Sequence, residues 1–384
     1  MKKIMNIAAV ALCMSAMVVT SCKSDDDEPE VPVNTSGIPS DALATENPTI
    51  GNSTTSIPNL QYTVQPDGND AIVRLDMTGI QQADSYDWMR LVGTAQEGQN
   101  VWLSVDGKPK GISVYNNADD NAESQVLSAD LVFLVDNSGS MSQEANAIAR
   151  DIKEWAQKLA ASSLDIKFAC VGYSEYGTIN GCINLTDAES LGAFLDRSTG
   201  TSRTVGFVGE DASALQSAAN GMQRVYDECG GMALRYADGN ISFRPGSNRI
   251  YVNFTDEPNQ PNNRSEYSVE FFADQSNWNT NQGTVHTVYS GSPSFTETLL
   301  YREYPWHISE YTGGTTLYAP SNFTGVTLES LPVTGAMTNS YVIRFTNVRE
   351  FMDGNDHEVK ITVLSADGNT RAERVFNMNF GTAQ

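Results

Sequence analysis

The middle of the chain alternates short apolar runs with amphipathic segments. Residues 131–135 are all apolar, which is typical of a strand buried on both faces of a parallel sheet. In the following segment, 142–159, apolar residues recur at helical spacing, and Ser142 is suited to cap that helix. The same change of period recurs further along, with strands expected at 166–173, 249–255 and 285–290 and helices at 187–194, 212–227 and 265–278. The pattern predicts a doubly wound, Rossmann-like α/β domain.

On both sides of this middle part, apolar and polar residues alternate with a period of two, as in half-buried strands. The alternating runs are 71–77, 101–105 and 112–115 before it, and 341–345, 358–363 and 374–378 after it. Turn signals such as Asp106-Gly107 and Asp367-Gly368 separate them. Either the two flanks pair into one small β-sandwich in which the α/β domain is inserted, or they form two separate β modules. The domain limits we expect are 59–127, 128–332 and 333–384.

The N-terminal residues have the pattern of a targeting sequence. Met1-Lys2-Lys3 is positively charged and residues 4–19 are almost continuously apolar, which predicts a secretory signal peptide over 1–21. It ends in Val19-Thr20-Ser21-Cys22, which resembles the bacterial lipobox. The resemblance implies cleavage before Cys22 and lipidation of its sulfur. The alternative is an ordinary signal peptide with an incidental cysteine.

The segment after Cys22 is acidic and then polar. Lys23 followed by the acidic residues 25–28 resembles the surface-export signal of Bacteroidetes lipoproteins, although a solvated charge run would look the same. From there to Pro58 the chain is rich in Pro, Ser, Thr and Asn, and we expect a flexible tether over 22–58. The sequence thus predicts a protein of the outer membrane that faces outward. Its lipid would be its only contact with the membrane.

The charge and the histidine content argue against two classes of function, nucleic-acid binding and histidine-based catalysis. The chain of 384 residues has 24 Lys and Arg against 47 Asp and Glu, a net charge of −23, which argues against a general nucleic-acid binder. An apolar fraction of 40% is ample for a folded core. The three histidines, His286, His307 and His357, are far apart in the sequence, which disfavours histidine-based catalysis, and His286 lies in a strand expected to be buried.

Three cysteines remain once Cys13 leaves with the signal peptide and Cys22 takes the lipid: Cys170, Cys182 and Cys229. An extracytoplasmic setting permits disulfides, but three thiols leave at least one unpaired. Cys170 and Cys182 flank a predicted turn. Either they form a cross-strand disulfide, or all three cysteines are small buried apolar residues.

The candidate chemistry lies directly after the first apolar strand. Asp136-Asn137-Ser138-Gly139-Ser140 stands between that strand and the first helix. Sites in open α/β sheets form outside the carboxyl ends of strands, so one carboxylate and two hydroxyls should converge there. A set made only of oxygen suits a hard divalent cation such as Mg²⁺, Mn²⁺ or Ca²⁺.

This Asp-x-Ser-x-Ser motif resembles the metal-ion-dependent adhesion site of von Willebrand factor type A (vWA) domains. A strand at 250–255 followed by Asp256 is similar to the second acidic strand end of that family, and the resemblance covers about 129–332. It implies a vWA fold in which Ser138 and Ser140 ligate the cation through their hydroxyls. Asp136 and Asp256 would bind it directly or through water.

The family's remaining ligand, usually a Thr, precedes the third helix. The corresponding stretch here, 209–215, contains no Thr. Ser213 could supply the hydroxyl, or Glu210 or Asp211 could supply a carboxylate instead. An extra carboxylate would cancel more of the charge of the cation and weaken its attraction for an acidic ligand.

A cation with few direct carboxylates and one open position can bind an Asp or Glu of a partner. The resemblance therefore implies a surface lipoprotein that binds an extracellular protein or glycan ligand. The alternative is a structural component of the envelope or of a fimbria-like assembly that uses the vWA domain as a scaffold. We expect no catalytic residues, because the motif lacks a second acid at position 138 and no histidine pairs with its serines. An aromatic loop at 301–311 forms either a sugar-binding surface or loop packing.

Overall fold

The computed structural model describes residues 37–83, 85, 87–119, 128–160, 164–174, 176–197, 203–321 and 332–383. The predicted signal peptide, Cys22 and the first part of the tether lie outside the described residues, as does the segment 322–331. Among the helices that are described, none is both long and apolar enough to span a bilayer.

A seven-stranded sheet forms the centre of the α/β part, in the order β12-β11-β10-β6-β7-β8-β9. The strands are β6 (Ser128–Asp136), β7 (Asp165–Ser174), β8 (Thr178–Thr186), β9 (Gly206–Val208), β10 (Asn248–Thr255), β11 (Thr284–Ser290) and β12 (Thr316–Ala319). Every pair is parallel except β7 with β8. Without the short β9, the six strands follow the order 3-2-1-4-5-6 of a doubly wound sheet. The order reverses between β6 and β10.

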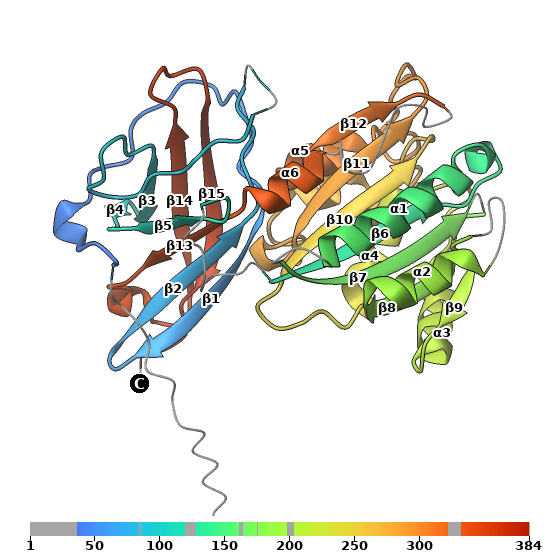
Figure 1. Ribbon diagram of the computed structural model, residues 1–384, viewed down its shortest axis with the longest axis horizontal. Helices are drawn as coiled ribbons and strands as arrows, with labels where there is room; N and C mark the ends of the chain where they lie inside the picture. Colours follow the sequence, from blue (N-terminus) through green and yellow to red (C-terminus); the bar gives the residue numbers. More distant parts are fainter. Residues whose placement is uncertain are drawn as a thin grey trace, which may run out of the picture. The chain divides into compact units, whose positions relative to one another are not determined.

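Helices cover both faces of this sheet (Figure 1). One face carries α1 (Ala145–Ala160), α2 (Ala188–Asp196) and α6 (Pro332–Thr338), and the other carries α3 (Ala212–Gly221), α4 (Gly230–Asn240) and α5 (Trp306–Thr312). Successive residues of β6 enter opposite cores: Leu131 packs with the first set, and Val132 packs with the second. This explains the uninterrupted apolar run of that strand, and the predicted mixed α/β class is confirmed.

Two predicted helices differ from those observed. The segment expected as one helix over 212–227 ends at Gly221, and a loop leads to α4, which the apolar pattern did not reveal. The segment 265–278 forms only the short 3-10 helices η4 (Ser265–Tyr267) and η5 (Val269–Ala273). Between them the backbone of Ser268 is extended, and its side chain accepts a hydrogen bond from the N–H of Glu270. This local bond competes with a continuous helix.

The flanking segments form two four-stranded antiparallel sheets, β1-β2-β13-β5 and β15-β14-β3-β4. Their strands are β1 (Leu60–Asp67), β2 (Asp70–Met77), β3 (Val101–Val105), β4 (Lys108–Pro109), β5 (Ser113–Asn116), β13 (Tyr341–Phe345), β14 (Asp356–Leu364) and β15 (Arg371–Asn379). Each sheet thus combines strands from before and after the α/β part. Buried side chains of both sheets, such as Leu75 and Ile343 of one and Leu103 and Ile361 of the other, belong to one hydrophobic core.

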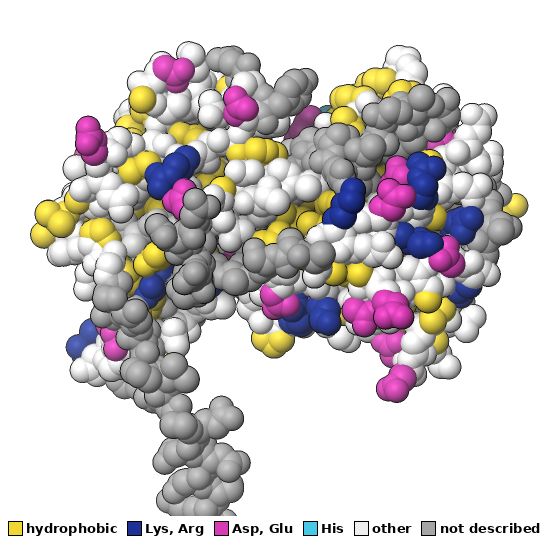
Figure 2. Space-filling model, viewed as in Figure 1, with side chains coloured by type: hydrophobic (Ala, Val, Ile, Leu, Met, Phe, Trp, Pro, Cys, Tyr) yellow, Lys and Arg dark blue, Asp and Glu magenta, His cyan; other side chains and the backbone are white. Residues whose placement is uncertain are grey.

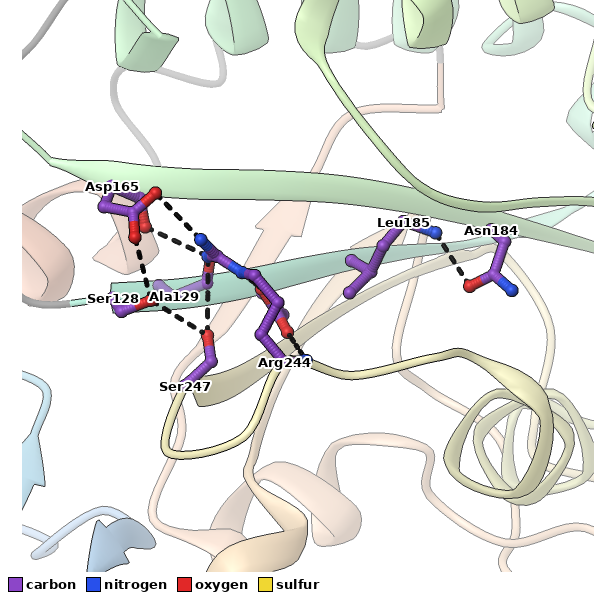
Figure 3. A network of polar contacts seen from close by, with 8 residues as sticks. Ser128, Ala129, Asp165, Asn184, Leu185, Arg244 and Ser247 are labelled. Carbon is purple, nitrogen blue, oxygen red and sulfur yellow. Dashed lines mark hydrogen bonds and ion pairs between the residues drawn. The ribbon is translucent and has the colours of Figure 1, made fainter. Parts of the chain in front are cut away.

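The amino ends of β6 and β7 are joined by Arg244, as Figure 3 shows. Its Nε donates to Asp130 Oδ1 at 2.6 Å, and its backbone N–H donates to Asp130 Oδ2 at 2.7 Å. The same guanidinium donates to Asp165 Oδ1 and to the carbonyl of Ala129, each at 2.8 Å. The fully buried Asp130 is therefore paired and hydrogen-bonded on both oxygens, as a buried charge requires. This network fixes the end of the sheet opposite to the candidate site.

Cys170, Cys182 and Cys229 are free and buried. The structure therefore follows the second of the two alternatives, in which the cysteines act as small apolar residues. Burial raises the pKa of the Cys182 and Cys229 thiols to about 12, which makes them poor nucleophiles at neutral pH. His286 is likewise buried in β11, and burial lowers its pKa to about 3.

Candidate metal centre

The predicted motif lies where the strand order of the sheet reverses. β6 ends at Asp136, its neighbour β10 ends at Thr255, and Asp256 follows directly. Beyond Asp136 the chain turns through the 3-10 helix η2 (Ser140–Ser142), whose Met141 is fully buried. This apolar anchor holds the polar loop against the sheet edge, and the carboxyl ends of β6 and β10 bring the two aspartates together.

Four of the predicted site residues form one chain of polar contacts. Ser138 Oγ lies 2.9 Å from Ser140 Oγ, and Ser140 Oγ donates to Asp256 Oδ1 at 3.0 Å. The backbone N–H of Ser138 donates to Asp136 Oδ1 at 2.8 Å. The structure thus brings Asp136, Ser138, Ser140 and Asp256 together, as the sequence predicted.

Asp136 is a buried carboxylate that no cationic side chain of the described residues pairs with. Its side chain is 2% exposed, and burial raises its pKa to about 7. Hydrogen bonds from Ser138 and Thr255 oppose this rise, while the charge of Glu228 adds to it, and none of the groups that shift this pKa is cationic. Removing a carboxylate from water without pairing it is costly. A cation at this edge of the sheet would offset that cost.

Asp256 is in a similar electrostatic environment. Burial raises its pKa, a hydrogen bond from Ser140 lowers it, and the negative charge of Glu144 raises it further. Glu144 precedes α1 and is 1% exposed. Its Oε1 accepts a hydrogen bond from Ser290 Oγ at 2.8 Å, whereas its Oε2 is buried with no hydrogen-bond partner among the described residues. A second buried carboxylate therefore acts on the candidate site, one that sequence analysis missed.

The donor set fits a hard divalent cation. In the described ranges, no three His, Cys, Asp or Glu side chains meet in a way that could hold a metal ion. The set therefore depends on its two serine hydroxyls as much as on its two aspartates. Hydroxyl and carboxylate oxygens are ligands that Mg²⁺, Mn²⁺ and Ca²⁺ prefer.

The other two candidate ligands lie elsewhere. Asp211 Oδ2 accepts a hydrogen bond from Asn184 Nδ2, and the same amide group contacts Ser242 Oγ at 3.2 Å. Ser213 lies on the exposed side of α3. The structure does not bring Asp211 or Ser213 to Asp136, because the segment before α3 follows β9 away from the carboxyl edge of the sheet.

The loop before α4 carries a buried acid, Glu228, whose charge acts on Asp136. Glu228 is buried, and its charge raises the pKa of both Asp136 and Tyr173. Gln260 holds it in place, with its N–H 3.0 Å from the Glu228 carbonyl and its Nε2 3.2 Å from Oε2. Sequence analysis missed Glu228 because it did not predict α4. The available signal was an acid shortly before the glycine pair that opens this helix.

Polar side chains also fix the motif from its other side. Asn137 Nδ2 donates to Asn180 Oδ1 at 2.8 Å, and Thr204 Oγ1 donates to Asn137 Oδ1 at 2.6 Å. These contacts leave no room for a side chain on Gly172, where an added Cβ would lie 2.4 Å from Asn137 Nδ2. The second residue of the motif therefore orients the loop through its own hydrogen bonds.

The aromatic loop is largely packed. Trp306 is 8% exposed and stacks on Tyr304 with ring centroids 4.6 Å apart, and Phe295 contacts Tyr304 at 4.8 Å. Packing within the loop thus accounts for Tyr304 and Trp306. Tyr301 remains exposed.

Comparison with known proteins gives no family model and no curated protein that matches this chain. Similar solved structures include the conserved hypothetical protein BatB from Bacteroides thetaiotaomicron, with 15% identity, coverage of 55% of this chain and 96% of that chain, and a TM-score of 0.34. Proximal thread matrix protein 1 from the mussel byssus, with a zinc-occupied MIDAS motif, has 14% identity, coverage of 62% and 50%, and a TM-score of 0.35. The manganese-loaded TRAP protein of Plasmodium vivax has 11% identity, coverage of 72% and 99%, and a TM-score of 0.33. At such scores, the assignment of the site rests on its own geometry.

Proposed function

We propose that this chain is a vWA-type binding protein that holds a divalent cation through Asp136, Ser138, Ser140 and Asp256. The observation that carries the proposal is the chain of oxygen contacts from Ser138 through Ser140 to Asp256, beside a buried Asp136 that pairs with no cationic side chain in the part of the chain that the structure describes. It lies at the point of a doubly wound sheet where ligand sites form.

The bound cation would supply a positive charge with a position open to a carboxylate of a partner. The chain's own residues fix where that charge sits. Thr255 Oγ1 donates to Asp136 Oδ2 at 2.8 Å and the Ser138 N–H donates to Oδ1, so both carboxylate oxygens are oriented before any cation arrives. The two serine hydroxyls are neutral ligands, so they add no negative charge to that of the two aspartates.

The expected signal peptide and lipobox determine the cellular location that we propose. We propose that Cys22 carries a lipid, that the segment up to residue 58 is a tether, and that the folded part lies outside the outer membrane. We also propose that the two antiparallel sheets are one β-sandwich in which the α/β domain is inserted. Their shared core and their interleaved strands support this arrangement.

Calorimetric titration with Mn²⁺ and Mg²⁺ tests the metal site. The wild-type protein should bind one ion, Asp136→Ala and the double variant Ser138→Ala/Ser140→Ala should lose binding, and Ser142→Ala should retain it. Ser142 is a matched control because it is an exposed serine two residues after Ser140. Absence of an ion in the wild-type titration would remove the basis of the proposal.

Binding to immobilised matrix proteins and glycans tests whether the protein binds a ligand through the cation. Binding that both a chelator and Asp136→Ala abolish would support adhesion through the cation. Binding that survives both would show that the metal centre is not the contact, and would favour a scaffold role in an envelope assembly.

A further inference from the structure

A cavity of about 700 Å³ lies along the edge of the central sheet where β9 is the last strand. Its walls come from the end of β8, from α2, and from the loop between β9 and α3. The described residues that line it include none of the residues that form the metal centre. Its size falls in the usual range of ligand cavities, about 300–1,000 Å³. The cavity is therefore a second candidate binding site.

The floor of the cavity is apolar. Ile183 of β8 and Phe194 of α2 are buried, and Val208 of β9 packs against the same hydrophobic core. An apolar group that entered the cavity would leave water, which favours its binding in proportion to the area that it buries. The floor therefore selects a ligand whose middle part is apolar.

One part of the cavity wall carries a positive charge. Arg197 follows α2, and its guanidinium lies over the ring of Phe194, 4.3 Å from the ring centroid. Its Nε donates to the carbonyl of Phe194 at 3.1 Å, and its Nη2 donates to the carbonyls of Val205 and Gly206. Among the described residues, no carboxylate pairs with this cation. Because backbone carbonyls hold Nε and Nη2 in place, Nη1 is oriented to bind a carboxylate of a ligand.

Another part of the cavity wall is acidic. Glu210 and Asp211 line it, in the turn between β9 and α3. Asp211 Oδ2 accepts a hydrogen bond from Asn184 Nδ2. Neither carboxylate takes part in the ion pairs that Lys and Arg side chains form in the described part of this domain. An amino group of a ligand would therefore meet an unpaired carboxylate there.

The short strand β9 separates these two charges. Arg197 is hydrogen-bonded to the carbonyl of Gly206, the first residue of β9, whereas Glu210 comes two residues after Val208, the last one. An extended chain advances about 3.3 Å per residue, so roughly 10 Å separates the two charged parts of the wall. The ends of an extended tripeptide are separated by roughly the same distance. A free amino acid, which carries both charged groups on one carbon, is too short to reach both.

The strand edge beside the cavity favours a peptide over other molecules with two charged ends. β9 pairs with β8 only at residues 181–183, and β8 continues along the cavity to Thr186. The main chain of an extended peptide can bind at such an edge. We propose that the cavity binds a peptide of about three residues with apolar side chains, its carboxylate on Arg197 and its amino group on Glu210 or Asp211. This site involves no cation, so the inference is independent of the proposed function.

Calorimetry of the whole protein with the tripeptide Leu-Ala-Leu tests the proposal. The free peptide should bind, and its affinity should exceed that of the N-acetylated and of the C-amidated peptide by about fivefold each, because each block removes one charge pair. Triglycine has the same charged ends without apolar side chains, and it should bind about tenfold more weakly or worse. These comparisons use the wild-type protein, so they do not depend on whether a variant folds.

Charge-removing variants show whether the cavity is the place of binding. Arg197→Gln should bind the free and the amidated peptide equally, and Glu210→Gln/Asp211→Asn should bind the free and the acetylated peptide equally. Arg224→Gln and Glu189→Gln, at exposed residues that do not line the cavity, should bind all forms like the wild type.

Four results would overturn the proposal. They are no binding of the free peptide at millimolar concentration, equal affinities of the wild type for the free and the blocked peptides, equal losses in the control variants, and binding of decanoate in place of the peptide. Loss of binding in a chelator would place the peptide at the metal centre and overturn the assignment to this cavity. A wild type that binds the peptide but no Mn²⁺ would contradict the proposed function alone.

Discussion

At the scale of single residues, the candidate metal centre is dominated by carboxylates that the fold buries, and among the described residues none is paired with a cationic side chain. Asp136 loses the hydration of its charge and gains two hydrogen bonds, and its pKa still rises to about 7. Glu144 keeps one carboxylate oxygen buried without a hydrogen-bond partner. A cation bound beside them would offset such unfavourable charges, and in the proposed function this is the source of the site's affinity.

Asp136→Asn should abolish the stabilisation of the protein by Mn²⁺ while the protein still folds. The amide keeps the shape of the side chain and removes the charge, so Mn²⁺ should no longer raise the melting temperature. At a Mn²⁺ concentration of 100 times Kd, the wild type should gain about 2.7 kcal/mol by mass action. Thermal melts with and without Mn²⁺ measure the difference, and an equal shift in both proteins would place the ion elsewhere.

Glu144→Gln should weaken cation binding while the site remains folded. The amide oxygen can still accept the hydrogen bond of Ser290, but the negative charge beside Asp256 is gone. Substitution of a residue that contacts the ligands but not the metal typically lowers metal affinity by about tenfold or more. Calorimetry should show such a loss for Glu144→Gln and none for Glu154→Gln, an exposed glutamate on α1. Equal affinities for the two variants would show that the charge of Glu144 does not reach the ion.

At the scale of elements, the sequence predicts what is local and periodic. The run 131–135 and the Asp-x-Ser-x-Ser loop are adjacent in the chain, so strand, loop and helix follow directly from the pattern. Asp256 was predictable because it ends a second apolar strand. Glu228 was not, because α4 opens with Gly230-Gly231, residues of poor helix propensity that tertiary contacts select. For the same reason, sequence analysis looked for the remaining ligand in the 210–213 segment and did not consider the loop before α4.

Two glycines of α4 with different surroundings test whether tertiary contacts select the glycines at the start of this helix. A Cβ on Gly231 would lie 2.2 Å from the Tyr267 carbonyl oxygen, whereas a Cβ on Gly239 meets nothing within 4 Å. Gly231→Ala should therefore destabilise the protein by about 2 kcal/mol or more, since backbone must move. Gly239→Ala should stabilise it by about 0.5–1 kcal/mol through helix propensity. Denaturant unfolding curves compare them, and a mild effect of Gly231→Ala would show that the helix start is loosely packed.

At the scale of the whole molecule, the segments before and after the α/β part are tied to each other by polar contacts as well as by their common core. His357 of β14 contacts Asp106 Oδ2 through Nδ1 at 2.8 Å, and Asp353 Oδ1 through Nε2 at 3.1 Å. Asp106 and His357 are 251 positions apart in the chain. On the face that Figure 2 shows, acidic and basic side chains are interspersed. Local pairs such as His357 with Asp106 and Asp353 contribute to how stability depends on pH.

Stability should therefore fall with rising pH in a way that His357 controls. Burial lowers the pKa of His357, but its hydrogen bonds to Asp106 and Asp353 and their charges outweigh burial and raise it above the ordinary 6.5. A raised pKa means that the stabilisation is complete below about pH 6.5 and is lost as the pH rises through the pKa of the folded state. Between pH 6 and 8.5 the melting temperature of the wild type should approach that of His357→Gln, because the variant lacks this protonation. The difference between the two curves isolates His357 from Asp136, whose ionisation is common to both proteins. A difference that stays constant across this range would show that the pKa of His357 is the same in the folded and unfolded states, so that its contacts with Asp106 and Asp353 do not raise it.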